Sequence, residues 1–303
     1  MSTVTTGDLA KALWPGVNAW TNQSYDMYPE EFKEIFEEHK SSKNFEEDVS
    51  ISGTGLLTEK AEGAGIEYQD FKQTFIQRYT HRVYASGFIL TREMIEDNQY
   101  REVAEKYSRM LGKSCKETKE NVGANVLNRG FNSSFTGYDG VELFSTAHKL
   151  GKGGTFQNEL TTAADLSEAA LEQAIIDIMG FVDDAGLQIA VNPRKLVVPR
   201  QLAFTAERIL ASNLQNDTAN NAVNALASMQ VLPDNFCVNH YLTDADAWFI
   251  KTDCPDGMKL FQRRQRELTN DTDFNSENMK FKITERYVFG WTDPRGMFGS
   301  PGA

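Results

Sequence analysis

The sequence feature that most constrains the fold is a long stretch of helical periodicity that starts at Thr91. Apolar residues recur there every three or four positions, Thr91 suits the N-terminal cap, and Gly130 suits the end of the helix. An uninterrupted helix of this kind rises about 1.5 Å per residue and would reach on the order of 50 Å. The pattern predicts a single helix from Thr91 to Asn128, longer than a compact domain needs. Gly112 and Gly123 would either bend it or allow close packing.

The segment before this helix has the pattern of extended chain. Between residues 48 and 87, apolar and polar residues alternate around two glycine-containing stretches. The pattern predicts a long two-stranded excursion from the body of the protein. Because a two-stranded hairpin is marginal alone in water, it needs a sheet or another subunit to cover it.

The first fifty residues predict an arm followed by a short amphipathic helix. Pro29 suits the first helical position, and Phe32, Ile35, Phe36 and His39 would share one face. Several aromatic residues precede this helix, which is a large aromatic surface for a chain terminus. Two alternatives remain open: the segment packs on its own subunit, or it contacts a neighbouring one.

The remainder of the chain predicts an α+β fold. A second amphipathic helix would start at Ser167 and end at Gly186, and a third would lie between Leu202 and Leu210. Short apolar runs bounded by turn residues predict strands. These strands are Leu187–Val191, Leu196–Val198, Trp248–Ile250, and a terminal hairpin formed by Met258–Leu268 and Met279–Trp291.

Composition restricts the partners of the protein. The chain has 303 residues, enough for about two domains of ordinary size. Its formal net charge is −12, whereas gripping nucleic acid usually takes a basic face, so sequence-specific DNA binding is not expected. No apolar run has the roughly 18 residues that a membrane span requires, and no membrane partner is expected. The polar start of the chain is unlike a signal peptide, which predicts folding in a cytoplasm.

The segment from Leu143 to Thr155 is the strongest candidate for chemistry. Ser145 precedes His148 by three residues, which suggests a nucleophile with its base, and a glycine-rich run follows. The glycines that a nucleophile elbow requires around its serine are missing. Thr146 and Gly153 break the phosphate-loop pattern. We therefore expect a structural turn without catalytic residues, and a hydrolase that uses Ser145 and His148 remains a weaker alternative.

The sequence predicts neither a metal site nor a cofactor site. The three cysteines are far apart and form no CxxC pair, and the four histidines lack HExxH spacing. Asp271, Asp273 and Asn275 alternate like the start of a calcium loop, but Ser276 and Lys282 occupy the positions that need glycine and glutamate. A solvated acidic loop is the better interpretation.

The order of the predicted elements, together with five short segments, resembles the major capsid proteins of tailed bacteriophages, in particular the Mu-like major head subunits. The resemblance covers most of the chain. The segments that carry it are 28–36, 45–48, 143–148, 192–199 and 290–296.

The resemblance implies a division of the chain into five regions. Residues 1–48 would be an N-terminal arm, and residues 49–86 an extended β-hairpin loop that overlies a neighbouring subunit. Residues 87–198 would form a peripheral domain that includes the spine helix 91–128. Residues 199–256 would form an axial domain, and residues 257–303 would return as strands to the peripheral domain.

The resemblance also implies a structural function without enzymatic activity. Subunits would assemble as hexamers and pentamers into an icosahedral head in the host bacterial cytoplasm and enclose DNA without reading its sequence. A separate scaffolding protein, a portal protein and a cement protein are the further partners that it suggests. A related alternative is the shell of an encapsulin-like compartment. The residues predicted to contact neighbouring subunits are Trp14, Trp20, Phe32, Phe36, Lys60, Glu62, Phe71 and Phe75.

Overall fold

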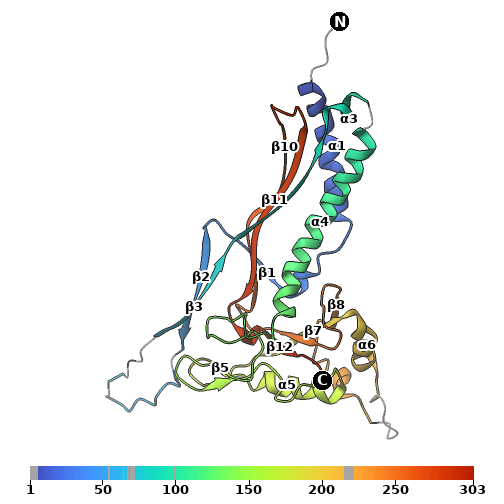
Figure 1. Cartoon of the computed structure of the whole chain (residues 1–303). Coiled ribbons are helices and arrows are strands. Elements are labelled where there is room, and N and C mark those ends of the chain that lie inside the picture. Colours follow the sequence, from blue (N-terminus) through green and yellow to red (C-terminus); the bar gives the residue numbers. More distant parts are fainter. Residues whose placement is uncertain are drawn as a thin grey trace.

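The computed structural model describes residues 6–53, 55–63, 65–66, 68, 72–97, 100–214 and 222–303. A slender half contains a long helix beside a long β-hairpin, and a broader half contains a second sheet with shorter helices (Figure 1). A further hairpin projects sideways from the region where the two halves meet (Figure 1). The fold is α+β, as the sequence predicts.

The helix expected from Thr91 to Asn128 is present as two helices. These are α3 (Arg92–Glu96) and α4 (Tyr100–Asn128), and Asp97 lies in a turn. The prediction of one uninterrupted helix is therefore wrong. Asp97 suits the interruption because an aspartate side chain competes with the helix for backbone hydrogen bonds. The predicted C-terminal end is confirmed, because the Gly130 N–H bonds the Leu127 carbonyl just beyond α4.

The N-terminal segment is more helical than expected. Helix α1 (Thr6–Asp26) lies beside α4 (Figure 1) and includes Pro15, a residue that normally argues against a helix interior. Helix α2 is short (Phe32–Ile35), and Phe36 is already extended. The predicted continuation of this helix to His39 is wrong, because strand β1 (Glu37–Lys40) pairs in parallel with β10 (Met258–Thr272).

The two glycines of α4 allow close packing, one of the two roles that the sequence left open. A side chain at Gly112 would collide with the backbone carbonyl of Thr21 in α1. A Cβ at Gly123 would lie 3.2 Å from the ring of Phe289. Both positions thus bring α4 closer to its neighbours than any larger residue would.

The predicted terminal hairpin is confirmed and is longer than expected. Strand β10 pairs with β11 (Met279–Trp291), and both belong to a sheet of order β1-β10-β11-β4. Strand β4 (Arg82–Leu90) pairs with β11 and not with the excursion that precedes it. Alternate residues of β11 from Met279 to Phe289 are buried, which is the pattern of a sheet with one covered face.

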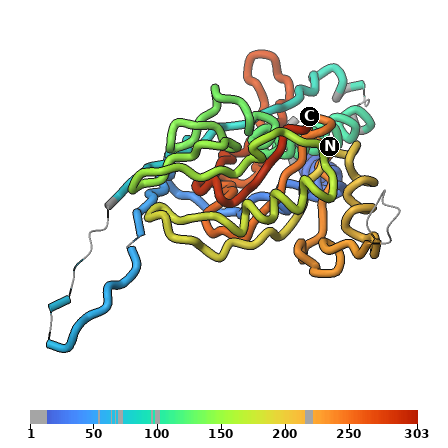
Figure 2. Tube along the Cα trace, turned by 90° about the horizontal axis from the view of Figure 1, so that it is seen from below, coloured from blue at the N-terminus to red at the C-terminus, as the bar shows by residue number. Residues whose placement is uncertain are grey.

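The predicted two-stranded excursion is formed by β2 (Phe45–Ser52) and β3 (Lys72–Thr80), which pair antiparallel. We call these strands and the residues that join them the β2–β3 hairpin, and its residues 55–63 the hairpin tip. The hairpin tip extends away from the rest of the chain in both views (Figures 1 and 2).

The second sheet has the order β12-β9-β7-β8. Its strands are β7 (Pro193–Pro199), β8 (Phe236–Asn239), β9 (Trp248–Thr252) and β12 (Met297–Ser300). The elements around it are β5 (His148–Lys149), β6 (Thr155–Phe156), α5 (Glu168–Met179), η1 (Arg200–Leu202), α6 (Ala203–Ala211), α7 (Ala225–Met229) and η2 (Pro294–Gly296).

Helix α5 begins as predicted and ends earlier. The Ser167 hydroxyl accepts a hydrogen bond from the Ala170 N–H and caps the helix. The helix ends at Met179 because Gly180 follows, so the end predicted at Gly186 is wrong. The strand predicted for Leu187–Val191 is absent from the described chain, where this segment contributes one isolated bridge between Val182 and Gln188.

Buried apolar residues form three clusters along the molecule. One fills the broad half around α5 and β7, and one lies where α2, α4 and the sheet of β11 meet. The third lies at the far end of the slender half, between α1, α4 and the ends of β4 and β11. Because α4 and β11 run past two of these clusters, their mutual packing sets the long axis of the subunit.

The close approach at Gly112 leads to a prediction. Replacing a glycine by alanine in the interior of an exposed helix stabilises that helix by about 1 kcal/mol. Here the added Cβ must displace α1, so we expect Gly112→Ala to lower the free energy of unfolding by about 1–3 kcal/mol. Urea unfolding measures the difference, and the exposed neighbour Lys113→Ala serves as the control. A stabilised Gly112→Ala variant would contradict the packing.

Candidate functional site

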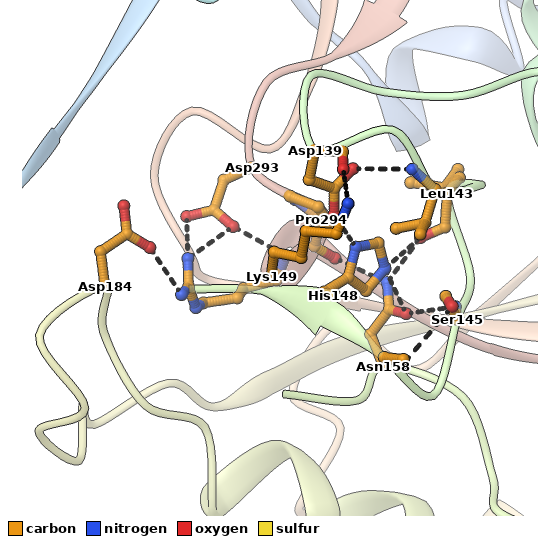
Figure 3. Close-up of polar contacts among 12 residues, drawn as sticks. Asp139, Leu143, Ser145, His148, Lys149, Asn158, Asp184, Asp293 and Pro294 are labelled. Carbon is orange, nitrogen blue, oxygen red and sulfur yellow. Dashed lines mark hydrogen bonds and ion pairs between the residues drawn. The ribbon is translucent and has the colours of Figure 1, made fainter. Parts of the chain in front are cut away.

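The segment singled out as a catalytic candidate contains a fully buried histidine. The His148 ring lies 2.6 Å from the Asp139 carboxylate through Nδ1 and 3.0 Å from the Asn158 side-chain oxygen through Nε2 (Figure 3). Nε2 also lies 3.2 Å from the Leu143 carbonyl. All three partners are oxygen atoms of neighbouring groups in the fold. Both ring nitrogens are therefore engaged in contacts that hold the ring in one orientation.

Asn158 connects this segment to the C-terminal part of the chain. Its amide nitrogen lies 2.7 Å from the Leu143 carbonyl, 3.0 Å from the Pro294 carbonyl and 3.2 Å from the Met297 carbonyl. Asn158 is fully buried, so these bonds satisfy carbonyls that water does not reach. The histidine and the asparagine therefore fasten the chain that follows α4 to the turn that precedes β12.

Ser145 is not arranged as a nucleophile. Its N–H donates to the Asn158 oxygen at 2.9 Å, and its hydroxyl accepts a weak bond from the Ala147 N–H at 3.4 Å. Within the described chain, no hydrogen bond joins the Ser145 hydroxyl to His148. This geometry does not support the hydrolase alternative. The glycine-rich run makes the turn between β5 and β6, where Gly153 and Gly154 have φ angles of 99° and 98°.

The base of the β2–β3 hairpin is tied to the body by polar side chains. The Asp48 carboxylate accepts from the Lys259 ammonium at 2.7 Å and from the Thr292 hydroxyl at 2.6 Å. The Ser50 hydroxyl donates to Asp184, whose other oxygen accepts from the buried Arg295 guanidinium at 3.0 Å. These contacts fix the direction in which the hairpin leaves the body.

A buried carboxylate joins α4 to the segment before β1. The two carboxylate oxygens of Glu120 accept from the backbone N–H groups of Glu31 and Phe32, each at 3.0 Å. Burial raises the pKa of Glu120 to about 7, although both backbone bonds and nearby Lys116 lower it. Glu31 in turn accepts from the His240 backbone N–H at 2.9 Å. This chain of contacts links α4, α2 and the turn after β8.

The residues predicted to contact neighbouring subunits lie in different environments. Phe32 and Phe36 are buried in their own subunit, which is the first of the two alternatives that the sequence left open. Trp14 and Trp20 are partly buried and pack on the cluster at the far end of the slender half. These four aromatic residues thus use much of their surface within the chain.

The predicted contact residues of the β2–β3 hairpin are more exposed. Lys60 and Glu62 lie exposed in the hairpin tip, and Phe71 lies outside the described residues. Phe75 is partly buried, and its ring centroid lies 4.8 Å from that of Tyr138. The structure does not bring these residues together into one site.

Sequence reasoning missed the exposed apolar residues of the same hairpin. The apolar residues of the hairpin that are more than one-third exposed are Phe45, Val49, Ile51, Leu56, Leu57, Ile66, Tyr68 and Ile76. Leu57 is 91% exposed and Ile51 is 61% exposed. An exposed apolar surface of this extent is unusual on a single subunit and typically marks a contact with another protein. The alternation of apolar and polar residues along the two strands could have indicated these exposed residues, because it puts aliphatic side chains on a hairpin that no other predicted element packs against.

Other kinds of site have little support. Burial raises the pKa of the Cys115 thiol to about 12 and that of Cys237 to about 11, which makes both poor nucleophiles. Among the described residues, no three His, Cys, Asp or Glu side chains are grouped to hold a metal ion. None of the described helices has the length and apolar character needed to cross a membrane.

Comparison with known proteins assigns the family. Residues 76–299 match the phage capsid protein family, which is more than half of the chain. No curated protein sequence matches. The fold and the family match define a structural subunit of a viral shell. The chain belongs to the phage capsid protein family and is a structural, non-enzymatic major capsid protein of the virion.

Solved structures share the fold at low sequence identity. The capsid of cyanophage P-SCSP1u matches with a TM-score of 0.58 and 10% identity over 91% of this chain and 88% of that chain. The procapsid of bacteriophage JBD30 matches with a TM-score of 0.53 and 14% identity over 98% and 76%. A virus-like particle from Pyrococcus furiosus matches with a TM-score of 0.52 and 8% identity over 94% and 97%.

The buried Asn158 leads to a second prediction. Asn158→Ala removes the side-chain hydrogen bonds to the Leu143, Pro294 and Met297 carbonyls, so we expect the free energy of unfolding to fall by about 3 kcal/mol. Ser145→Ala removes one weak bond and serves as the matched control, with an expected change below about 1 kcal/mol. Thermal and urea unfolding measure both. Equal losses in the two variants would contradict the structural role of Asn158.

The raised pKa of Glu120 leads to a third prediction. The folded chain binds a proton at Glu120 more tightly than the unfolded chain, whose glutamate pKa is 4.5. The contribution to stability is therefore fully present below pH 4.5 and is lost as pH rises through about 7. The expected loss is on the order of 3 kcal/mol.

Urea unfolding of the wild type and of Glu120→Gln across this pH range isolates the effect. The glutamine cannot ionise, so we expect the difference in unfolding free energy between the two proteins to change with pH in that direction. A difference that stays constant from pH 4 to pH 8 would rule out the raised pKa.

Proposed function

We propose that this chain assembles as hexamers and pentamers into an icosahedral phage head that encloses DNA. The observation that carries the proposal is the β2–β3 hairpin, which leaves the body (Figure 2). It exposes aliphatic and aromatic side chains along its length. A single copy of the chain has nothing to bury this surface. A closed shell supplies a neighbour for every copy, because each subunit repeats the same contact.

The anchoring of the hairpin supports this proposal. Asp48 and Ser50 hold its base to the body at one angle, whereas Leu57 in the tip is 91% exposed. A rigid base with an uncovered apolar end is suited to reach one defined place on a neighbour. A flexible linker would need neither feature.

We further propose the five regions that the sequence suggested. The N-terminal arm would comprise residues 1–48, the extended loop 49–86 and the peripheral domain 87–198, with α4 as its spine helix. The axial domain would comprise 199–256, and 257–303 would return to the peripheral domain. The position of α4 along the slender half supports the spine helix of this division, whereas the second sheet takes its strands from the regions 87–198, 199–256 and 257–303.

We also propose the partners and the subtype that the resemblance of the sequence suggests. A separate scaffolding protein, a portal protein and a cement protein are proposed partners, with assembly in the host cytoplasm. A net charge of −12 favours loose, sequence-independent enclosure of DNA over tight binding. The five segments that resemble Mu-like head subunits support that subtype.

The family match favours a phage head over an encapsulin-like compartment, and the contents of the particles distinguish them. We expect purified particles from infected cells to carry nuclease-protected DNA and to be attached to tails. Enzyme cargo in uniform small shells would instead support the compartment.

The exposed side chains of the hairpin lead to a fourth prediction. We expect the triple variant Ile51→Ser, Leu57→Ser, Ile76→Ser to fold with nearly unchanged stability, because each side chain is at least half exposed. Its assembly into particles should fall by at least about tenfold, because a neighbour no longer buries these groups on contact. Sedimentation velocity measures the assembled fraction, and thermal unfolding of the free subunit measures the fold.

Gln73→Ser is the matched control, since Gln73 is an exposed polar residue on β3 of the same hairpin. It should assemble like the wild type. Normal assembly of the triple variant would show that the hairpin is not buried in the shell.

A further inference from the structure

A cleft of about 550 Å³ lies between the C-terminal half of α4 and the strands β3, β4 and β11. Its lining residues come from the C-terminal ends of β3 and β11, the start of β4 and the end of α4 with the chain that follows it. Its walls combine aromatic side chains with three arginines, Arg78, Arg82 and Arg129. We call it the arginine cleft.

The cleft is basic although the chain as a whole is acidic. No aspartate or glutamate lines it, whereas the chain has 43 acidic residues against 31 lysines and arginines. Arg78 is held by Glu47 at 2.8 Å. Arg82 and Arg129 have no carboxylate partner within the described chain, and the Arg129 guanidinium lies 4.7 Å above the Phe135 ring. The cleft therefore offers two guanidinium groups to an external acceptor.

Two buried donors line the same cleft without a partner. The Tyr287 hydroxyl and the Trp291 indole N–H are both buried and have no hydrogen bond among the described residues. Tyr287 is 0% exposed. Unpaired buried donors cost about 1–3 kcal/mol each, and because both atoms are closed to solvent they contribute to the cleft wall without contacting a ligand.

This chemistry fits a peptide that carries carboxylates next to apolar side chains. Arginine pairs with carboxylates through parallel hydrogen bonds, and the aromatic walls accommodate aliphatic groups. Phosphates on a DNA duplex fit less well, because a duplex is too broad to enter a cleft of this size.

The hairpin tip has the matching chemistry. Glu59 and Glu62 are exposed there and have no ion-pair partner among the described residues, and Leu57 beside them is 91% exposed. The tip cannot reach the arginine cleft of its own chain, because the cleft lies at the base of the hairpin and the tip extends away from it in both views.

We propose that the arginine cleft binds the hairpin tip of a second copy of this chain, with Glu59 and Glu62 against Arg82 and Arg129. The proposal rests on the proposed assembly into a shell and names the receiving surface.

Charge reversal on each side tests the contact. The cleft variant is Arg82→Glu with Arg129→Glu, and the tip variant is Glu59→Arg with Glu62→Arg. Each variant alone should assemble at least about tenfold less than the wild type, because like charges meet at every contact. Lys106→Glu, at an exposed position elsewhere on α4, is a single charge-reversal control and should assemble normally.

Mixing the two variants gives the decisive result. In a one-to-one mixture, basic tips meet acidic clefts and acidic tips meet basic clefts, so particles should return to at least half of the wild-type yield. Normal assembly of either variant alone, or no recovery in the mixture, would overturn the proposal.

Two controls separate the causes of failure. Circular dichroism checks that each variant folds, and Arg82→Gln with Arg129→Gln replaces the cleft variant if the glutamates disturb folding; its assembly should also fall, and normal assembly would overturn the proposal. A wild-type protein that never assembles would contradict the proposed shell itself, whereas wild-type particles with unaffected charge-reversal variants would contradict this contact alone.

Discussion

The packing of α4 on the β10–β11 sheet depends on one buried ion pair. The Lys119 ammonium lies 2.9 Å from the Glu285 carboxylate and 2.8 Å from the side-chain oxygen of Gln262. The side chains of Lys119 and Glu285 are 7% and 4% exposed. Charges this deeply buried are tolerated only when they are paired, and removing one partner typically costs about 3–5 kcal/mol. The pair therefore holds α4 in one register against the sheet.

This register positions the assembly surfaces. Glu120, the next residue on α4, holds the start of α2, and Arg129 near the end of α4 lines the arginine cleft. The chain after α4 is then fastened to the C-terminal turn by His148 and Asn158. The segment that looked like a catalytic site in the sequence thus stabilises the junction between the two halves of the subunit.

The sequence predicted the elements that depend on local patterning. The helix that ends at Asn128, the Ser167 cap and the β10–β11 hairpin follow from periodicity and from capping residues, and all three are present. Pairing partners were not predictable in this way. Strand β1 replaced the end of a predicted helix because β10 offers it parallel hydrogen bonds from more than 200 residues away. Helix α1 was missed because Pro15 lacks a backbone N–H and argues against a helix interior. The packing of α1 on α4, which the sequence pattern does not show, accompanies the helix in spite of this residue.

The candidate site was only partly predictable for the same reason. Aromatic residues near the N-terminus suggested contacts with neighbours, yet Phe32 and Phe36 are buried within the subunit. The arginine cleft combines residues from α4, β3, β4 and β11 that are up to about two hundred positions apart. Residues this far apart do not form a sequence motif. The exposed hairpin was recognisable, since a two-stranded element without a sheet requires cover.

Electron cryo-microscopy of particles formed by the purified chain, with its scaffolding protein where this is required, tests the account most directly. We predict closed shells in which each hairpin tip lies in the arginine cleft of an adjacent copy. A protein that remains a monomer under all conditions, or shells in which the β2–β3 hairpin contacts no neighbour, would contradict the account.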